Sequence, residues 1–236
     1  MSIKENVAKI RAEMESAAIA AGRDPKSILL CAATKMNDAA AVREAIAAGV
    51  DCCGENKVQE LTAKLAENAY EGAPVHFIGH LQTNKVKFVV GKVDLIQSVD
   101  SERLLIAIDR EAGKQGIVQD ILLEVNVGGE ESKSGFAPEE GLPLVEKIGE
   151  FPNIRVKGLM TIPPISQKNG DNVKFFKKIY NLAVDIIEKL DDNGMAKYLS
   201  MGMSDDYTDA IACGSTMIRV GTAIFGARDY TKLHQN

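Results

Sequence analysis

The sequence predicts a single (β/α)8 barrel preceded by one extra helix, an α/β fold of the TIM-barrel type. Short apolar runs, typical of strands buried on both faces, alternate along the chain with segments whose apolar residues recur at helical spacing. Eight such runs can be counted, and the length of 236 residues is close to the typical barrel length of about 250. No linker or shift in composition divides the chain, so we expect residues 1–236 to form one domain.

The extra helix comes first. Ile3, Val7 and Ile10 follow helical spacing with Lys, Arg and Glu between them, which predicts an amphipathic helix over residues 2–21. Gly22 is a typical residue to end it.

The barrel elements then follow in strict alternation. The predicted strands are residues 28–34, 50–54, 75–79, 93–99, 121–127, 154–161, 198–201 and 217–225. Between them, helical spacing predicts one helix that ends at Gly49, one over residues 84–90, one that Ser101 caps and one that Pro138 opens. The remaining helices are expected over residues 58–69, 176–187 and 205–212.

The charge balance argues against two classes of partner. The chain has 28 basic and 33 acidic residues, a net charge of −5 and a pI near 5.4, and it contains no basic stripe. These properties disfavour binding to nucleic acid or to an anionic membrane. No window approaches the roughly 20 apolar residues of a membrane span, and the first residues lead into a charged segment rather than a signal core. We therefore expect a cytoplasmic protein.

Lys35 ends the first apolar run and is the first candidate site residue. In parallel α/β proteins, sites are built at the carboxyl ends of the strands. Ala33 and Met36 flank this lysine, and partial burial lowers the pKa of a lysine amine and frees its lone pair for attack on a carbonyl. Lys35 is therefore either a Schiff-base lysine or an ordinary lysine that extends from a strand end into solvent.

Small polar residues and glycine follow the last two predicted strands. Ser200, Ser204, Gly221 and Thr222 lie where barrels of this kind frequently bind phosphate. Taken singly, Ser204 could merely cap the next helix and Gly221 could ease a bend. Their combination opposite a buried lysine favours a phosphate site.

Arg219 lies inside the last apolar run. A buried guanidinium needs an acceptor or an aromatic ring, because its desolvation is otherwise uncompensated. A heteroaromatic nitrogen of a ligand would serve, and so would a carboxylate such as Glu55.

The cysteines and histidines show no metal-binding pattern. The four cysteines lack CxxC spacing, so we expect buried, reduced thiols rather than metal ligands, and the three histidines are too few and too scattered for a zinc site. The residues concerned are Cys31, Cys52, Cys53, Cys213, His76, His80 and His234. No metal site is predicted.

Seven short motifs, spread from the first predicted strand to Gly226, are recognisable together. They are Ala32-Ala-Thr-Lys35, Gly54-Glu-Asn-Lys-Val-Gln-Glu60, His76-Phe-Ile-Gly-His-Leu-Gln-Thr-Asn-Lys85, Glu131-Ser-Lys-Ser-Gly135, Gly158-Leu-Met160, Leu199-Ser-Met-Gly-Met-Ser-Asp-Asp206 and Ile218-Arg-Val-Gly-Thr-Ala-Ile-Phe-Gly226. In content and order they resemble the pyridoxal 5′-phosphate homeostasis protein family over nearly the whole chain.

The resemblance implies a barrel like that of bacterial alanine racemase, with pyridoxal phosphate held as an internal aldimine on Lys35. It further implies that Arg219 faces the pyridine nitrogen. The residues that match the family's phosphate and ring contacts are Ser200, Ser204, Gly221, Thr222, Asn56 and Met201.

The resemblance also bears on activity. A cationic arginine at the ring nitrogen disfavours protonation of that nitrogen and so weakens the ring as an electron sink. In the racemase, a catalytic group comes from a second domain of a partner subunit, and the residues after the eighth predicted strand are too few for such a domain. We therefore expect a monomer that buffers, stores or delivers pyridoxal phosphate to apo enzymes, with no catalytic residue.

Two alternatives and one further role remain open. The alternatives are a low-activity amino-acid racemase and, without the resemblance, a Schiff-base aldolase that acts on a phosphorylated sugar. Lys133, in the Gly-rich loop of residues 128–135, is either a solvated surface lysine or a second amine that hands the aldehyde over.

Overall fold

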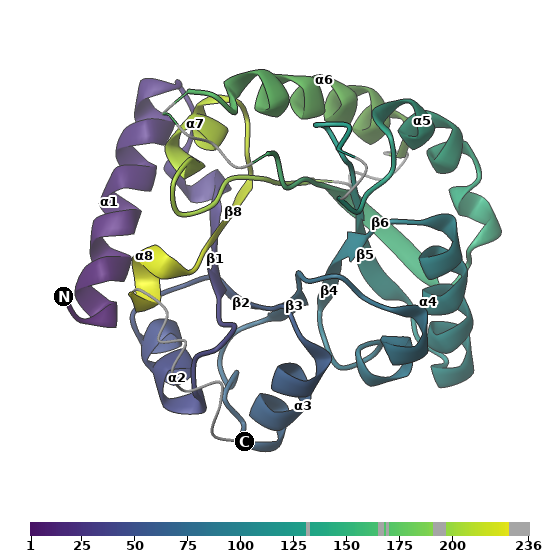
Figure 1. Ribbon diagram of the computed structural model, residues 1–236, viewed down its shortest axis with the longest axis horizontal. Coiled ribbons are helices and arrows are strands. Elements are labelled where there is room, and N and C mark those ends of the chain that lie inside the picture. The colour runs from purple at the N-terminus through teal and green to yellow at the C-terminus, as the bar shows by residue number, and fades with distance from the viewer. Residues whose placement is uncertain (131–132, 165–167, 169, 191–196, 227–236) are drawn as a thin grey trace.

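Eight parallel strands close into one barrel in chain order, with β8 paired to β1, and helices surround the barrel (Figure 1). The computed structural model describes residues 1–130, 133–164, 168, 170–190 and 197–226. The strands are β1 (Leu29–Ala33), β2 (Cys52–Glu55), β3 (Val75–Phe77), β4 (Leu95–Val99), β5 (Gln119–Glu124), β6 (Ile154–Met160), β7 (Tyr198–Ser200) and β8 (Met217–Val220). The predicted (β/α)8 barrel is confirmed.

Helices follow the strands as the sequence pattern predicts. The α-helices are α1 (Ile3–Ala20), α2 (Ala39–Ala47), α3 (Val58–Ala66), α4 (Glu102–Gln115), α5 (Pro138–Glu146), α6 (Val173–Leu190), α7 (Tyr207–Ala212) and α8 (Thr222–Phe225). Short 3₁₀ helices are η1 (Pro25–Ser27), η2 (Thr83–Phe88) and η3 (Ile148–Glu150). Among these described elements, no helix combines the length and the apolar character that crossing a membrane requires.

The extra helix α1 completes the outer layer where β8 meets β1. It begins with a capping box, in which the Ser2 hydroxyl accepts from the Glu5 amide and the Glu5 carboxylate accepts from the Ser2 amide. Its buried face, which includes Val7 and Ile10, packs against α2, α7 and α8 (Figure 1). Because α8 has only 4 residues, α1 covers the barrel at this join.

Apolar side chains form two layers, one outside and one inside the barrel. The outer layer, between strands and helices, includes Leu30, Phe77 and Ile218. The inner layer consists of Cys31, Cys52, Leu95, Leu122, Met160 and Met217, with Leu29 and Tyr198 at its edge. Since successive strand residues point to opposite faces, Cys31 points inward while Leu30 points toward the helices.

Two predicted elements need correction. The eighth strand was expected to reach residue 225, but it ends at Val220, because Gly221 starts a helical turn in which its carbonyl accepts from the amides of Ile224 and Phe225. A β-branched apolar run does not by itself distinguish a strand from a buried turn. The helix expected over residues 84–90 is the 3₁₀ helix η2, which begins at Thr83.

Candidate functional site

Lys35 lies directly after β1, at the mouth of the barrel. The strand ends at Ala33, and the amide of Thr34 still donates to the carbonyl oxygen of Gly54 on β2, at 2.9 Å. Lys35 follows in a turn and is half-buried. Cys31 and Ala33 are the inward-facing residues of β1 that precede this turn.

A buried ion pair lies behind the turn that carries Lys35. The amine of Lys64, on α3, donates to the carboxylate of Glu55 at 2.5 Å and to the carbonyl oxygen of Thr34 at 2.7 Å. The Thr34 hydroxyl donates to the same carboxylate at 2.5 Å. The side chains of Lys64 and Glu55 are 7% and 0% exposed. Breaking a pair at this depth would leave an uncompensated charge, so the pair is expected to stay intact. Because both of its members hydrogen-bond to Thr34, it holds Thr34 in place.

The residue on the other side of Lys35 is anchored by the same helix. Met36 has a φ of 62°, a left-handed conformation that non-glycine residues rarely adopt. Its amide donates to the carboxylate of Glu60 at 2.6 Å, and that carboxylate lies 3.5 Å from the Lys64 amine. Strained backbone of this kind persists only where its surroundings hold it. Both neighbours of Lys35 are thus attached to α3.

Arg219 points from β8 into the barrel interior and is 4% exposed. Its guanidinium donates to the Ser200 hydroxyl at 2.5 Å and to the carbonyl oxygen of Thr161 at 2.8 Å. Burial lowers the pKa of Arg219 from its usual value, while Cys31 and Glu124 act in the opposite direction. Arginine stays cationic in proteins, so the barrel interior carries a fixed positive charge.

One predicted contact of Arg219 differs from the structure, and Ser200 makes contacts that were not predicted. Glu55 faces α3 and pairs with Lys64, so the prediction that it could accept from Arg219 is wrong. Ser200, expected at the phosphate, directs its hydroxyl into the barrel, where it accepts from Arg219 and donates to the Gln97 side chain at 2.7 Å. The sequence does not indicate in which direction the Glu55 and Ser200 side chains point, because strand register decides which residues face inward.

An acidic group lies at the mouth on β5. Burial raises the pKa of Glu124 to about 7, with a further contribution from Asp100, whereas Arg219 and His80 act to lower it. The Nδ1 atom of His80 lies 3.0 Å from the Asp100 carboxylate and 3.3 Å from the Ser134 hydroxyl. Glu124 can therefore gain or lose a proton near neutral pH, within electrostatic range of the buried arginine.

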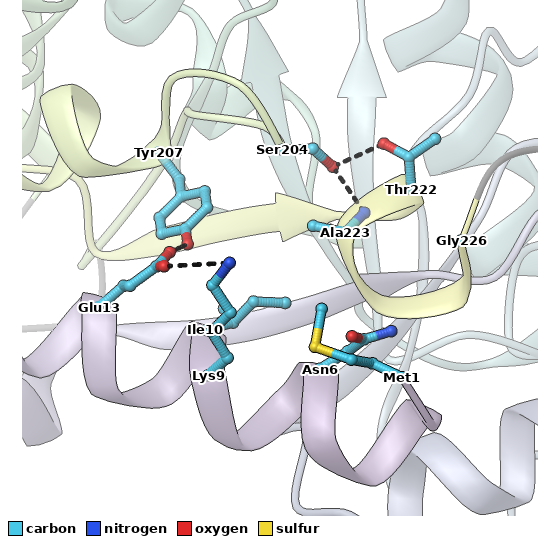
Figure 2. A pocket seen from close by; sticks show the side chains of 10 residues that line it. All are labelled: Met1, Asn6, Lys9, Ile10, Glu13, Ser204, Tyr207, Thr222, Ala223 and Gly226. Carbon is cyan, nitrogen blue, oxygen red and sulfur yellow. Dashed lines mark hydrogen bonds and ion pairs between the residues drawn. The ribbon is translucent and has the colours of Figure 1, made fainter.

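Ser204 and Thr222 converge after β7 and β8. The Thr222 hydroxyl and the Ala223 amide both donate to the Ser204 hydroxyl oxygen, at 3.0 and 3.4 Å (Figure 2). These groups line a pocket of about 450 Å³ whose opposite wall is α1, with Asn6 and Lys9. The Thr222 hydroxyl and the Ala223 amide donate to Ser204 here, so the Ser204 hydroxyl is the donor of this group that remains for an anion's oxygen.

Gly221 and Asn56 have features that packing within the chain does not explain. A Cβ added to Gly221 would meet only Ala33, at 3.4 Å, an ordinary contact, so no neighbouring side chain requires a glycine. The Asn56 side-chain oxygen is buried and has no hydrogen-bond partner among the described residues. Such an unpaired acceptor costs about 1–3 kcal/mol, which a ligand donor would offset.

Met201, predicted at the ring, and Lys133, considered as a second amine, lie in the core and on the rim respectively. Met201 is fully buried in the outer layer, between strands and helices, so its side chain contributes to the core. Lys133 lies on the rim, where its amine donates to the carbonyl oxygen of Pro163 at 3.0 Å and pairs with Glu130 at 2.7 Å.

Sequence reasoning missed Glu60 and Lys64. Their spacing of four residues within a predicted helix was the available signal, because it places both on one helix face. That spacing is common on solvated surfaces, and it did not indicate that the pair lies beneath the Lys35 turn.

The closed barrel, the lysine after β1 and the hydroxyl pair after β7 and β8 define a ligand-binding (β/α)8 barrel. Residues 2–229 match the family described as "Alanine racemase, N-terminal domain". A "Pyridoxal phosphate homeostasis protein" of Pseudomonas aeruginosa is 43% identical over 231 residues, which cover 97% of each chain. The chain therefore belongs to the family of pyridoxal phosphate homeostasis proteins.

Solved structures agree with this assignment. PipY of Synechococcus elongatus, with PLP bound, has a TM-score of 0.81 and 33% identity, and the match covers 95% of this chain and 100% of PipY. An alanine racemase of Clostridium difficile has a TM-score of 0.68 and 16% identity, and the match covers 95% of this chain and 57% of the racemase. The second likeness extends to the fold alone.

Proposed function

We propose that this protein binds pyridoxal phosphate and buffers, stores or delivers it, with Lys35 carrying the cofactor as a Schiff base. The observation that carries the proposal is Lys35 at the barrel mouth together with the cationic Arg219 in the barrel interior. The family assignment and the PLP-bound structure of PipY support it.

The residues at the mouth fit this cofactor. When bound, pyridoxal phosphate supplies an aldehyde that condenses with an amine, and Lys35 would be that amine. Ser204 and Thr222 would contact the phosphate, and the missing side chain of Gly221 allows its close approach. Asn56 offers an unpaired buried oxygen toward the ring.

Other residues of the chain orient these groups. Lys64 and Glu60 hold the two residues that flank Lys35, so the backbone from which its side chain extends is fixed. Ser200 and Thr161 hold the Arg219 guanidinium, and in this proposal Ser200 acts on Arg219 rather than on the phosphate.

Arg219 favours storage over turnover. A guanidinium that faces the ring nitrogen disfavours protonation of that nitrogen, and an unprotonated ring accepts electrons poorly from an amino-acid α-carbon. Slow or absent turnover follows from this charge.

A second candidate function, a low-activity amino-acid racemase, is favoured by Glu124. A buried carboxyl with a pKa of about 7 suits an acid or base that transfers protons near neutral pH. The two functions differ in whether the α-proton of a bound amino acid exchanges with solvent.

The cofactor proposal is tested by absorbance and mass spectrometry of the purified protein. We expect a visible band and, after borohydride reduction, a pyridoxyl adduct on the peptide that contains Lys35. Lys35→Ala should lose both, while Lys26→Ala, an exposed lysine at the opposite end of β1, should keep both. An adduct found on other lysines in the wild type would contradict the assignment of Lys35.

The racemase alternative is tested by incubating the loaded protein with L-alanine in deuterated water. We expect no α-proton exchange at enzyme-like rates. Rapid exchange that Glu124→Gln abolishes would favour the racemase and overturn the storage function.

A further inference from the structure

Two cysteines and one histidine meet inside the barrel, one layer below the mouth. Cys31 and Cys52 are direct partners across β1 and β2, and His76 follows on β3. Their two sulfur atoms and a ring nitrogen all lie within 4.8 Å of one another. The three residues are only 0%, 2% and 6% exposed. None of them is needed to hold the cofactor in the function proposed above.

We propose that Cys31, Cys52 and His76 form a binding site for a thiophilic metal ion, and that Cu(I) is the ion it fits best. Thiolates and imidazole are the donors that Cu(I) and zinc prefer. With metal–sulfur bonds of about 2.3 Å, donor atoms around one ion lie roughly 3.5–4 Å apart. Starting from separations of at most 4.8 Å, small side-chain rotations suffice to close the site around the ion.

The charge of Arg219 favours a monovalent ion. Binding displaces the thiol protons to solvent and leaves two thiolates. One Cu(I) and two thiolates carry a net charge of −1, which balances the cationic Arg219, the register partner of Cys31 on β8. A divalent ion with two thiolates is neutral, so it leaves the Arg219 charge to Glu124, whose pKa burial raises to about 7.

The Gln97 side chain and Met217 surround the His76 ring. The side-chain nitrogen assigned to Gln97 lies 2.8 Å from the Nδ1 atom of His76 and 3.1 Å from the sulfur of Met217. In this arrangement Gln97 donates to Nδ1, so Nε2 can bind metal only after the Gln97 amide turns and its oxygen accepts from Nδ1–H. The Met217 thioether places a further soft donor on the same side of the barrel.

Small residues separate the sulfur atoms from the mouth. Ala33 follows Cys31 on the inner face of β1, and Gly54 follows Cys52 on β2. A Cβ added to Gly54 would lie 2.9 Å from the Cys31 sulfur, so the glycine leaves the space that this sulfur occupies. The Ile78 side chain also packs over Gly54, 2.7 Å from the same added Cβ, so an ion that enters at the mouth must pass Ile78 to reach the sulfurs.

The test is a titration of the reduced protein with Cu(I) under argon, in competition with bicinchoninate. We expect one ion per chain, and X-ray absorption should report two sulfur ligands and one nitrogen ligand. Cys31→Ala and Cys52→Ala should each weaken binding by at least about 100-fold. Cys213→Ala is the matched control, because this half-buried thiol after α7 should leave the affinity unchanged.

The design separates this site from folding defects and from the cofactor site. X-ray absorption on the wild type requires no variant, and Cys31→Val fills the vacated volume if the alanine variant unfolds. Lys35→Ala should bind Cu(I) as the wild type does, so loss of the cofactor function would leave this result intact. The proposal is overturned if the wild type fails to compete with bicinchoninate, if Cys213→Ala removes the ion, or if Zn(II) binds more tightly than Cu(I).

Discussion

Replacing Lys64 by methionine should lower the free energy of unfolding by about 3–5 kcal/mol, because Glu55 is left buried without a counter-ion. The side chains of the pair are 7% and 0% exposed and 2.5 Å apart, so solvent offers the orphaned carboxylate little compensation. For a chain of this size, about 2–4 °C of melting temperature is lost per kcal/mol, which predicts a fall of roughly 6–20 °C. Urea denaturation at pH 7, followed by circular dichroism, measures the free energy directly.

Two further variants sharpen the experiment. Lys114→Met removes an ion pair of 3.1 Å with Glu111 in which the lysine side chain is 59% exposed, and it should cost less than about 1 kcal/mol. The double variant Glu55→Gln, Lys64→Met removes both buried charges and should regain most of the lost stability. A Lys64→Met protein within about 1 kcal/mol of the wild type would refute the reasoning.

The same variants test whether the pair positions Lys35. Lys64 donates to the Thr34 carbonyl oxygen, so removing it releases the residue before Lys35 even when Glu55 is neutral. Affinity for pyridoxal phosphate should therefore fall at least about 10-fold in the double variant, although its stability is restored. A double variant with wild-type affinity would show that the pair serves stability alone.

The remaining predictions concern pH and backbone packing. Glu124 has a pKa raised to about 7 in the folded protein, whereas in the unfolded chain it loses its proton near pH 4.5. Its contribution to the free energy of unfolding is therefore fully present below pH 4.5 and is lost as the pH rises through 7. Between about pH 4.5 and pH 8, the wild type should lose up to about 3 kcal/mol of its free energy of unfolding through this group, and Glu124→Gln should not show this loss. Urea denaturation at both pH values measures it. If the wild type and the variant lose the same free energy of unfolding between the two pH values, the prediction is contradicted. Gly158→Ala should cost several kcal/mol or prevent folding, because Gly158 has a φ of 139° and the new Cβ would lie 1.9 Å from the Tyr198 carbonyl oxygen. Gly149→Ala, where the Cβ meets nothing within 4 Å, is the control, and equal melting temperatures for the two variants would refute the argument.

The barrel was predictable because its signals are local. Apolar runs that alternate with amphipathic segments indicate parallel strands covered by helices, and closure brings every carboxyl strand end to one mouth. This is why Lys35, Ser204 and Thr222 could be assigned to the mouth from their positions after strands. Gly221 was recognised as a break in the last run, but whether the chain continued as strand or helix beyond it depended on hydrogen bonds that the pattern does not reveal.

Side-chain direction was harder to predict, because it depends on register between strands distant in sequence. Glu55 ends β2 facing α3, so its partner is Lys64 rather than Arg219. Cys31 and Cys52 are 21 residues apart and share no motif, yet register makes them direct neighbours. The sequence showed four unrelated cysteines, whereas the structure shows a pair beside a histidine.

The fixed charge of Arg219 connects the two proposed sites. Its guanidinium donates to the Ser200 hydroxyl and the Thr161 carbonyl oxygen, which hold it in the barrel interior. On the mouth side, Arg219 would face the cofactor ring. Cys31 of the proposed metal site is its register partner on β1. Two thiolates with Cu(I) would neutralise this charge and so ease protonation of the ring nitrogen. Metal loading should therefore shift the visible band of the bound cofactor, although no metal ligand touches the cofactor.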